Sequence, residues 1–301
     1  MTESTGHVTW TYKGEELQTW YKVVGDLHSF PTPVIALHGG PGMPHIMETH
    51  DTLHTAHGIP VVIYDQVGCG RSTRLGGKPA DFFAFELWFA ELDALLAHLR
   101  VASRFALVGH SWGGALAAEY TAARQPAGLR ALVVVGMPGD LQVWTRCARR
   151  LLTAGWPDKL AYLERCEEEG KLDDAEYRAV YGEYFQKHMI SVTPWPKPFA
   201  DGISAMLEDP TVPGHLMGPY KLKVSGTLRD WKIARNAPKI HVPTLLVSGI
   251  NDQAQEETMR PWFNGIPKIK WVVFAHSCHV PFFEEPDRYF DIVANFVRDL
   301  Q

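Results

Sequence analysis

The feature that most constrains this chain is a serine flanked by glycines, GHSWG at residues 109–113. The apolar run Phe105–Val108 precedes it and predicts a buried strand, while Ala115–Ala123 follows it and is rich in strong helix formers. A G-x-S-x-G segment between a strand and a helix is typical of a nucleophile elbow, a tight turn that raises the serine hydroxyl above a sheet. We therefore predict that Ser111 is a nucleophile.

Short apolar runs alternate with helical segments through the first half of the chain. Continuous apolar runs predict strands buried on both faces, and apolar residues at three- and four-residue steps over residues 85–99 predict a helix. This alternation predicts an α/β fold with a mostly parallel central sheet flanked by helices. The strands of this half, the first two forming a hairpin, are predicted at Val8–Tyr12, Leu17–Val24, Pro33–Leu37, Val61–Tyr64, Phe105–Val108 and Leu129–Val135.

The strand pattern stops between about residues 138 and 236, where the chain is helical with proline-rich breaks. Strands resume at Thr244–Ser248 and Ile269–Phe274, and a last helix is expected near residues 286–300. We therefore predict a core formed by residues 1–137 and 237–301, with residues 138–236 as an inserted helical lid. Core packing is the ordinary interpretation of the tryptophans in this segment, and pocket lining is the alternative.

A serine nucleophile needs a base to take its proton and an acid to orient that base. In this architecture the chain order is Ser, acid, His. Asp252 follows the next-to-last predicted strand, and His279 follows the last one. We favour these two over Asp140 and His276, which are the alternative acid and base.

Acyl transfer also needs hydrogen-bond donors for the developing oxyanion. The segment HGGPG at residues 38–42 follows a predicted strand and matches a loop that supplies one backbone N–H, at Gly40. The second N–H is expected from Trp112, the residue after the nucleophile.

Composition excludes several classes of protein. Lys and Arg number 29 against 34 Asp and Glu, a net charge of −5, whereas binding to nucleic acid or to an anionic membrane surface calls for a basic surplus. No apolar run approaches the roughly 18 residues of a membrane span, and the first residues lack the pattern of a signal peptide. The four cysteines have unrelated spacings. We expect a cytoplasmic protein without a cofactor that takes a small-molecule or short-peptide substrate, and its oligomeric state stays open.

Four histidines, His45, His50, His54 and His57, include pairs with the spacing of a helix face. Such a group could hold zinc. The chain contains no H-E-x-x-H segment, however, and we expect no metal site.

Four segments, standing in the same order as in the family, resemble the motifs of the proline iminopeptidases and the related L-amino-acid amidases. These families are α/β-hydrolases of the serine peptidase clan, and the similarity runs across nearly the whole chain, lid included. The segments are HGGPG at 38–42, DQVGCGRS at 65–72, GHSWGG at 109–114 and SCHVPFFEEP at 277–286.

The resemblance implies an α/β-hydrolase fold in which Ser111 is the nucleophile, Asp252 the acid and His279 the base. It further implies Gly40 and Trp112 as the oxyanion donors. The implied activity is cleavage of a small amide or peptide bond, releasing an N-terminal residue or hydrolysing an amino-acid amide.

Two positions depart from the family pattern. Family aminopeptidases hold the free amino group of the substrate with carboxylates, one directly after the catalytic Asp and one in a G-P-x-E-F segment of the lid. Here Gln253 follows Asp252, and Lys221 occupies the Glu position in GPYKL at residues 218–222. A lysine in that place repels an ammonium group, although a lysine facing solvent is the ordinary alternative.

These departures leave alternative functions open. The first is an esterase or lactonase acting on a small neutral or acidic substrate, and the second is a non-catalytic protein that binds a ligand under its lid. The candidate substrate-binding residues are Gly39, Lys221 and Gln253. Glu284 and Glu285 remain as carboxylates near the C terminus, and we expect them to charge the first turn of the last helix.

Overall fold

One mixed sheet of eight strands runs through the molecule in the order β1-β2-β4-β3-β5-β6-β7-β8. The computed structural model describes residues 3–300. β2 is antiparallel to both β1 and β4, and every other neighbouring pair is parallel. The strands are β1 (Glu3–Tyr12), β2 (Glu15–Val24), β3 (Val34–Leu37), β4 (Val61–Tyr64), β5 (Phe105–His110), β6 (Leu129–Val135), β7 (Thr244–Gly249) and β8 (Ile269–Phe274).

Burial along the strands agrees with their order in the sheet. Every residue of β3, β4, β5 and β7 is buried, as expected for central strands covered on both faces. β8 lies at the edge of the sheet and is only partly buried. The prediction of a mostly parallel sheet with flanking helices is confirmed, and the predicted strand positions agree with the structure to within a few residues.

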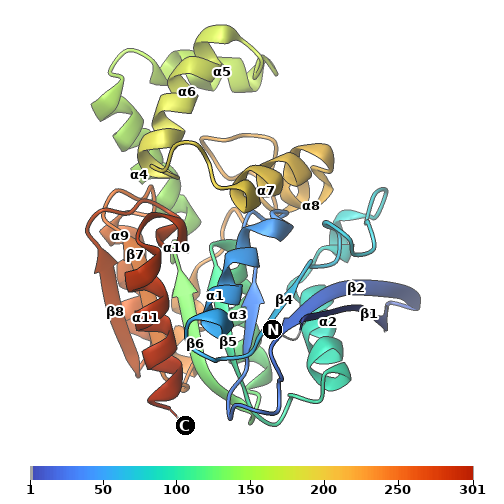
Figure 1. Cartoon of the computed structure of the whole chain (residues 1–301). Coiled ribbons are helices and arrows are strands. Elements are labelled where there is room, and N and C mark those ends of the chain that lie inside the picture. Colours follow the sequence, from blue (N-terminus) through green and yellow to red (C-terminus); the bar gives the residue numbers. More distant parts are fainter. Residues whose placement is uncertain (1–2, 301) are drawn as a thin grey trace.

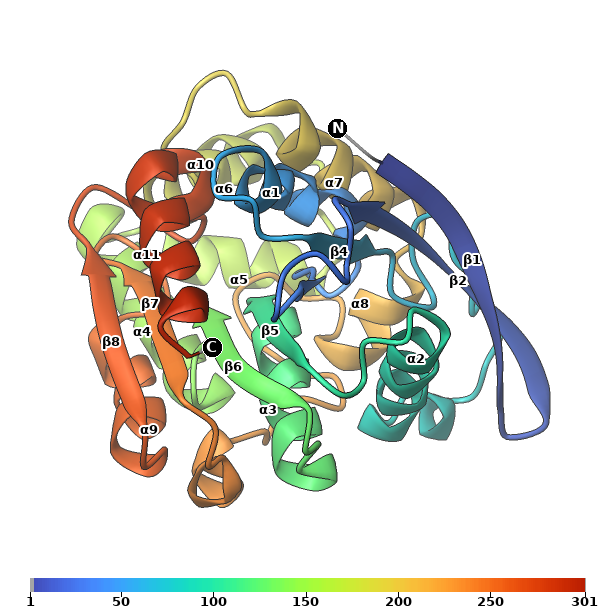
Figure 2. The same ribbon diagram turned by 60° about the horizontal axis from the view of Figure 1, so that its bottom comes forward.

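Helices cover both faces of the sheet (Figures 1 and 2). On one face α2, α3 and α9 pack over one apolar layer, and on the other α1 and α11 pack over a second. The helices are α1 (Thr52–Thr55), α2 (Phe85–His98), α3 (Trp112–Arg124), α4 (Leu141–Gly155), α5 (Leu160–Glu168), α6 (Ala175–His188), α7 (Lys197–Glu208), α8 (Thr211–Leu216), α9 (Glu256–Gly265), α10 (Pro281–Glu284) and α11 (Pro286–Arg298), with 3₁₀ turns at Pro44–Asp51, Ala80–Phe82, Ile233–Arg235 and Ala237–Lys239. Across residues 3–300, none of these helices combines the length and the apolar character that crossing a membrane requires.

Five helices, α4 to α8, are inserted between β6 and β7 and lie beyond one end of the strands (Figure 1). α4, α5 and α6 enclose a small apolar cluster of their own. Where the chain leaves and rejoins the sheet, Asp140 and Lys232 form a β-bridge, and their side chains form an ion pair of 2.9 Å. This tie supports the predicted lid, whose exact limits stay a prediction.

Candidate active site

The turn between β5 and α3 has the geometry of a nucleophile elbow. Ser111 has φ 51° and ψ −122°, a positive φ that residues with side chains rarely adopt. Flanking glycines make the turn possible, because a Cβ at Gly109 would collide with the carbonyl of Gly113, and one at Gly113 with the carbonyl of Leu37. Ser111 therefore stands at the start of α3, at the end of a central strand, as the motif predicts.

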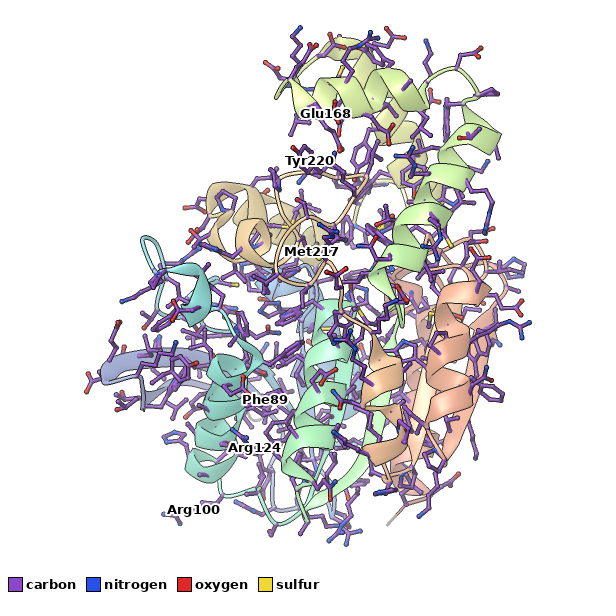
Figure 3. The ribbon with its side chains drawn as sticks, turned by 180° about the vertical axis from the view of Figure 1, so that it is seen from behind. Phe89, Arg100, Arg124, Glu168, Met217 and Tyr220 are labelled. Atoms are coloured by element: carbon purple, nitrogen blue, oxygen red, sulfur yellow. The ribbon has the colours of Figure 1, made fainter. Side chains whose placement is uncertain are left out.

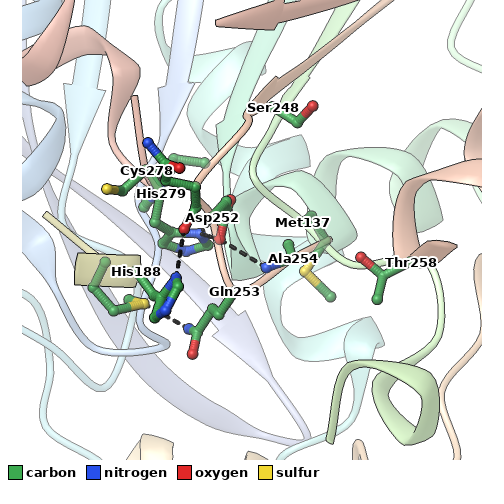
Figure 4. Close-up of polar contacts among 12 residues, drawn as sticks. Met137, His188, Ser248, Asp252, Gln253, Ala254, Thr258, Cys278 and His279 are labelled. Carbon is green, nitrogen blue, oxygen red and sulfur yellow. Dashed lines mark hydrogen bonds and ion pairs between the residues drawn. The ribbon is translucent and has the colours of Figure 1, made fainter. Parts of the chain in front are cut away.

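Asp252 and His279 are brought together from the ends of two neighbouring strands. The Nδ1 atom of His279 lies 3.0 and 2.9 Å from the two carboxylate oxygens of Asp252, and Asp252 also accepts a 2.8 Å hydrogen bond from the N–H of Ala254 (Figure 4). Both side chains are buried. A carboxylate only accepts, so the ring proton sits on Nδ1, and Nε2 keeps its lone pair and can accept a proton.

The alternative acid and base are engaged elsewhere. Asp140 accepts hydrogen bonds from the N–H groups of Gln142 and Val143 at the start of α4 and pairs with Lys232. Its carboxylate thus caps a lid helix. The side chain of His276 is exposed at the surface. These positions support Asp252 and His279 as the acid and base.

Two adjoining cavities of about 120 and 150 Å³ lie beside Ser111. Ser111, His279, Gly40 and Lys221 line both, and we call the two together the inner cavity. Five further lining residues come from four parts of the chain, including the lid: Trp112, Met137, Trp144, Met189 and Gln253. Six of the residues predicted for the site thus meet around one space, and among the lid tryptophans Trp144 lines it.

The two predicted oxyanion donors lie at the same cavity. Gly40 has φ 115°, and a Cβ there would meet the backbone nitrogens of Gly42 and Met43, so the loop requires glycine at this position. Trp112 is the first residue of α3, where a backbone N–H has no carbonyl partner within the helix. Both positions fit the oxyanion role.

Gln66 links these two loops, a contact that sequence reasoning missed. Its side-chain Oε1 accepts a 2.8 Å hydrogen bond from the indole of Trp112, and its Nε2 donates to the carbonyl of His38 at 3.0 Å. Its backbone N–H donates to Nε2 of His38 at 3.0 Å. Burial lowers the pKa of His38 to about 4, so this ring is a neutral acceptor near pH 7. The sequence signal for Gln66 was the DQ pair at residues 65–66, which opens the DQVGCGRS motif, but the motif alone indicated no role for this side chain.

The remaining candidates for substrate binding differ in position. Gly39 is buried against the elbow, where a Cβ would contact the side chains of His110 and Ser111, and its role in binding stays a prediction. Gln253 lines the inner cavity, and its amide contacts the Tyr184 hydroxyl and the sulfur of Met189.

Lys221 lines the inner cavity from the loop that follows α8. Glu167 holds this loop by accepting a 2.8 Å hydrogen bond from the backbone N–H of Lys221. Lys223 also reaches the cavity, but its ammonium lies 3.5 Å from Glu168 and 4.2 Å from the ring centre of Tyr220; Figure 3 labels both of these partners. Within residues 3–300 the ammonium of Lys221 forms no direct ion pair, and the nearby carboxylate of Glu167 balances its charge only in part.

Glu284 and Glu285 have a different role from the one predicted. Glu284 ends α10 and accepts a 2.7 Å hydrogen bond from the N–H of Cys278, while Glu285 accepts a 2.6 Å bond from the hydroxyl of Ser277. Both carboxylates therefore brace the loop that carries His279. Glu285 also stands at the start of the last helix, as expected, whereas Glu284 belongs to the preceding short helix.

Three of the four clustered histidines contact separate partners, and the buried Nδ1 of His54 has no hydrogen-bond partner within residues 3–300. His45 pairs with Glu48 at 2.8 Å, whereas the buried ring of His50 contacts the Tyr289 hydroxyl at 3.0 Å. His57 lies 3.7 Å from Asp291. In the part of the chain that the structure describes, no three His, Cys, Asp or Glu side chains are grouped so that they could hold a metal ion.

Comparisons with known proteins identify the family of this chain. Residues 32–286 match the model of the alpha/beta hydrolase fold family. The proline iminopeptidase of Levilactobacillus brevis is 34% identical over 280 residues, which cover 90% of each chain. The chain belongs to the proline iminopeptidase family of α/β hydrolases. The proline iminopeptidase of Lactiplantibacillus plantarum is 30% identical over 275 residues, which cover 90% of this chain and 94% of that protein.

Solved structures agree with this assignment. The crystal structure of VinJ is 37% identical, with a TM-score of 0.92 over 98% of this chain and 99% of that one. The proline iminopeptidase of Mycobacterium smegmatis is 33% identical, with a TM-score of 0.90 over 98% of both chains. An esterase from Thermogutta terrifontis, at 19% identity and a TM-score of 0.69, shares the fold. The predicted family and the α/β-hydrolase fold are confirmed.

Proposed function

We propose that this family member is a serine hydrolase that cleaves a small amide or peptide bond through an acyl-enzyme on Ser111. The observation that carries the proposal is the hydrogen-bonded pair of Asp252 and His279, whose histidine lines the same cavity as the serine of the elbow. The proline iminopeptidase relatives support the peptidase class, with an N-terminal residue or an amino-acid amide as the substrate.

In the first step the Ser111 hydroxyl attacks the carbonyl carbon as Nε2 of His279 takes its proton. Asp252 keeps the ring in the tautomer that leaves Nε2 free, and it stabilises the imidazolium that forms. The N–H groups of Gly40 and Trp112 donate to the oxyanion. His279 then protonates the leaving amine, and the acyl group stays on Ser111.

In the second step a water molecule attacks the acyl-enzyme, with His279 again as the base. The released acid leaves Ser111 in its starting state. The lid helices cover the cavity during these steps, and this covering strengthens each electrostatic contact by excluding water.

An esterase or lactonase acting on a neutral or acidic substrate is the second candidate, and the charge of the inner cavity favours it. Among the residues in 3–300 that line this cavity, none is Asp or Glu, while Lys221 and Lys223 are both present. A free ammonium group finds no carboxylate there. A carboxylate or a neutral acyl group fits this charge better.

The test compares prolyl and alanyl p-nitroanilides, each with a free or a blocked amino group, with short-chain p-nitrophenyl esters. Wild type is measured beside Ser111→Ala, and Ser103→Ala, a change at an exposed serine, is the matched control. Turnover of free aminoacyl anilides that is lost only in Ser111→Ala supports the peptidase. Ester turnover without preference for a free amine supports the second candidate. The absence of any Ser111-dependent turnover would instead favour a non-catalytic protein that binds a ligand under its lid.

A further inference from the structure

An open apolar groove of about 580 Å³ is lined by residues of α6 and α7, and nothing in the proposed chemistry uses it. We call it the α6–α7 groove. Aromatic and aliphatic side chains form most of its lining, chiefly Tyr181, Phe185, Trp195, Ile203, Met206 and Leu207.

The α6–α7 groove adjoins the inner cavity. Tyr181 and Lys221 line the groove and both parts of the inner cavity, and Phe185, Ile203 and Met206 line the groove and the part that borders α7. The α6–α7 groove therefore lies directly beside the inner cavity, with Tyr181 and Lys221 shared between them.

Two large apolar side chains are left unusually open to solvent in this groove. Leu207 is 65% exposed and Trp195 is 40% exposed. Trp195 is nevertheless held in place, with its ring centre 5.6 Å from that of Phe185 and 5.3 Å from that of Phe199. A fixed apolar surface that stays exposed next to a reaction site is typical of a ligand-binding groove.

The two-step mechanism decides which half of the substrate fits the groove. The acyl half remains bonded to Ser111 after the first step, whereas the leaving half must depart before water attacks. The inner cavity is small, and the α6–α7 groove opens to solvent and offers the way out. The only charged residues on the groove lining within residues 3–300 are Arg178 and Lys221, so a cationic leaving half is disfavoured.

We propose that the α6–α7 groove is the leaving-group subsite and that it selects an elongated apolar amine or alcohol joined to a small acyl group. The inference rests on the proposed acyl-enzyme mechanism and names the substrate class of that same site. The natural leaving group is then a hydrophobic molecule and not a polar peptide.

The experiment uses the full-length protein and a series of alanyl n-alkylamides and n-alkyl esters from methyl to octyl. Full burial of one methylene raises affinity about fourfold, and a groove open on one side gives about twofold per methylene. We expect kcat/KM to rise by about this factor with each added methylene, whichever series is turned over.

Leu207→Asp is the test variant, and Phe263→Asp is its matched control because Phe263 is a 46% exposed apolar residue on α9, away from the groove. Leu207→Asp should flatten the dependence on chain length and leave the methyl substrates unchanged, whereas Phe263→Asp should do neither. Trp195→Ala gives a second test of the same surface.

Three outcomes would overturn the inference. A flat dependence on the alkyl chain, with turnover that still requires Ser111, removes the subsite and leaves the proposed function intact. A gain with longer acyl chains in p-nitrophenyl esters from acetyl to octanoyl, in place of a gain with longer leaving groups, assigns the groove to the other half of the substrate. Absence of turnover in both series removes the subsite alone where the aminoacyl anilides or the p-nitrophenyl esters still show Ser111-dependent turnover, and it removes the proposed function as well where they do not.

Discussion

His110 donates a hydrogen bond from Nε2 of its ring to the backbone carbonyl of His279, over 3.1 Å. The two rings lie edge to face at a centroid distance of 4.8 Å, and Phe282 packs against His110 from another side at 5.1 Å. Burial holds the pKa of His110 well below its usual value, so its ring is neutral. The residue before the nucleophile therefore fixes the backbone of the proposed base.

This contact predicts that His110 is a positioning residue. In His110→Leu the carbonyl of His279 loses its donor, and we expect kcat to fall about tenfold with little change in KM. His110→Asn, which keeps a donor, should recover part of the loss. The measurement is steady-state kinetics across pH together with thermal unfolding. A lower melting temperature with unchanged kcat would show that His110 only stabilises the fold.

The hydrogen bond between Asp252 and His279 predicts a large catalytic effect from the exchange of one carboxylate oxygen for an amide nitrogen. Asp252→Asn removes the charge and allows an amide N–H to face Nδ1, which favours the wrong tautomer of His279. We expect kcat to fall roughly 10⁴-fold. Asp140→Asn is the control, because Asn also caps a helix, and it should keep activity within about threefold and lower stability by less than about 1 kcal/mol through loss of the partly exposed ion pair with Lys232. Similar losses in both variants would contradict the assignment of the acid.

The sequence was sufficient to predict the sheet and the elbow because both depend on local patterns. Runs such as Val61–Tyr64 are apolar at every position, and only a strand covered on both faces accommodates them. The glycines around Ser111 have no other structural reason than the tight turn. Asp252 followed from the rule that parallel strands end at the same edge of a sheet, and the choice of His279 over His276 also rested on the resemblance to the proline iminopeptidases.

Contacts between distant loops could not be read in the same way. Gln66 joins Trp112 to His38 across 46 and 28 residues, and no periodicity marks such a link. Glu285 stands at the start of α11, so the sequence suggested a helix-end charge, but the fold brings the Ser277 hydroxyl within 2.6 Å of it. The α6–α7 groove depends on how two lid helices pack, which composition does not encode.

The charge of the inner cavity predicts how the protein discriminates between substrates. In Lys221→Glu the positive charge beside Gln253 becomes negative, and a free ammonium group gains an attractive partner. We expect kcat/KM for free alanyl p-nitroanilide to rise about tenfold relative to the N-blocked compound. Lys268→Glu changes the net charge equally at an exposed site before β8 and should leave this ratio unchanged. An unchanged ratio in Lys221→Glu would mean that Lys221 faces solvent during binding.

A buried acid in α2 predicts an unusual dependence of stability on pH. Glu91 is fully buried, and its Oε1 accepts hydrogen bonds from the Thr19 hydroxyl at 2.5 Å and the Val67 N–H at 2.6 Å. Its Oε2 has no hydrogen-bond partner within residues 3–300. Burial raises the pKa of Glu91 from 4.5 to about 8, and the charge of Asp65 adds to the rise. The carboxyl is therefore protonated in the folded protein at neutral pH.

Between pH 4.5 and about 8 the folded chain holds a proton on Glu91 that the unfolded chain has released. The free energy of unfolding must then fall as pH rises through this window, by at most about 1.4 kcal/mol per pH unit. Four histidines with lowered pKa values, His38, His50, His110 and His188, act around and below pH 6.5 with the opposite sign, whereas His45, whose pKa is raised, acts with the same sign. The difference in stability between wild type and a variant that cannot ionise at residue 91 therefore isolates Glu91.

Urea unfolding at pH 6.5, 7.0, 7.5 and 8.0 measures the effect. The stability of wild type relative to that of Glu91→Gln, which cannot ionise, should fall steadily across this series. Glu86→Gln on the exposed face of the same helix should follow wild type, because Glu86 has no buried carboxyl to desolvate. A wild-type profile parallel to that of Glu91→Gln would mean that the folded protein accommodates a charged Glu91, with solvent or a rearranged partner reaching its Oε2.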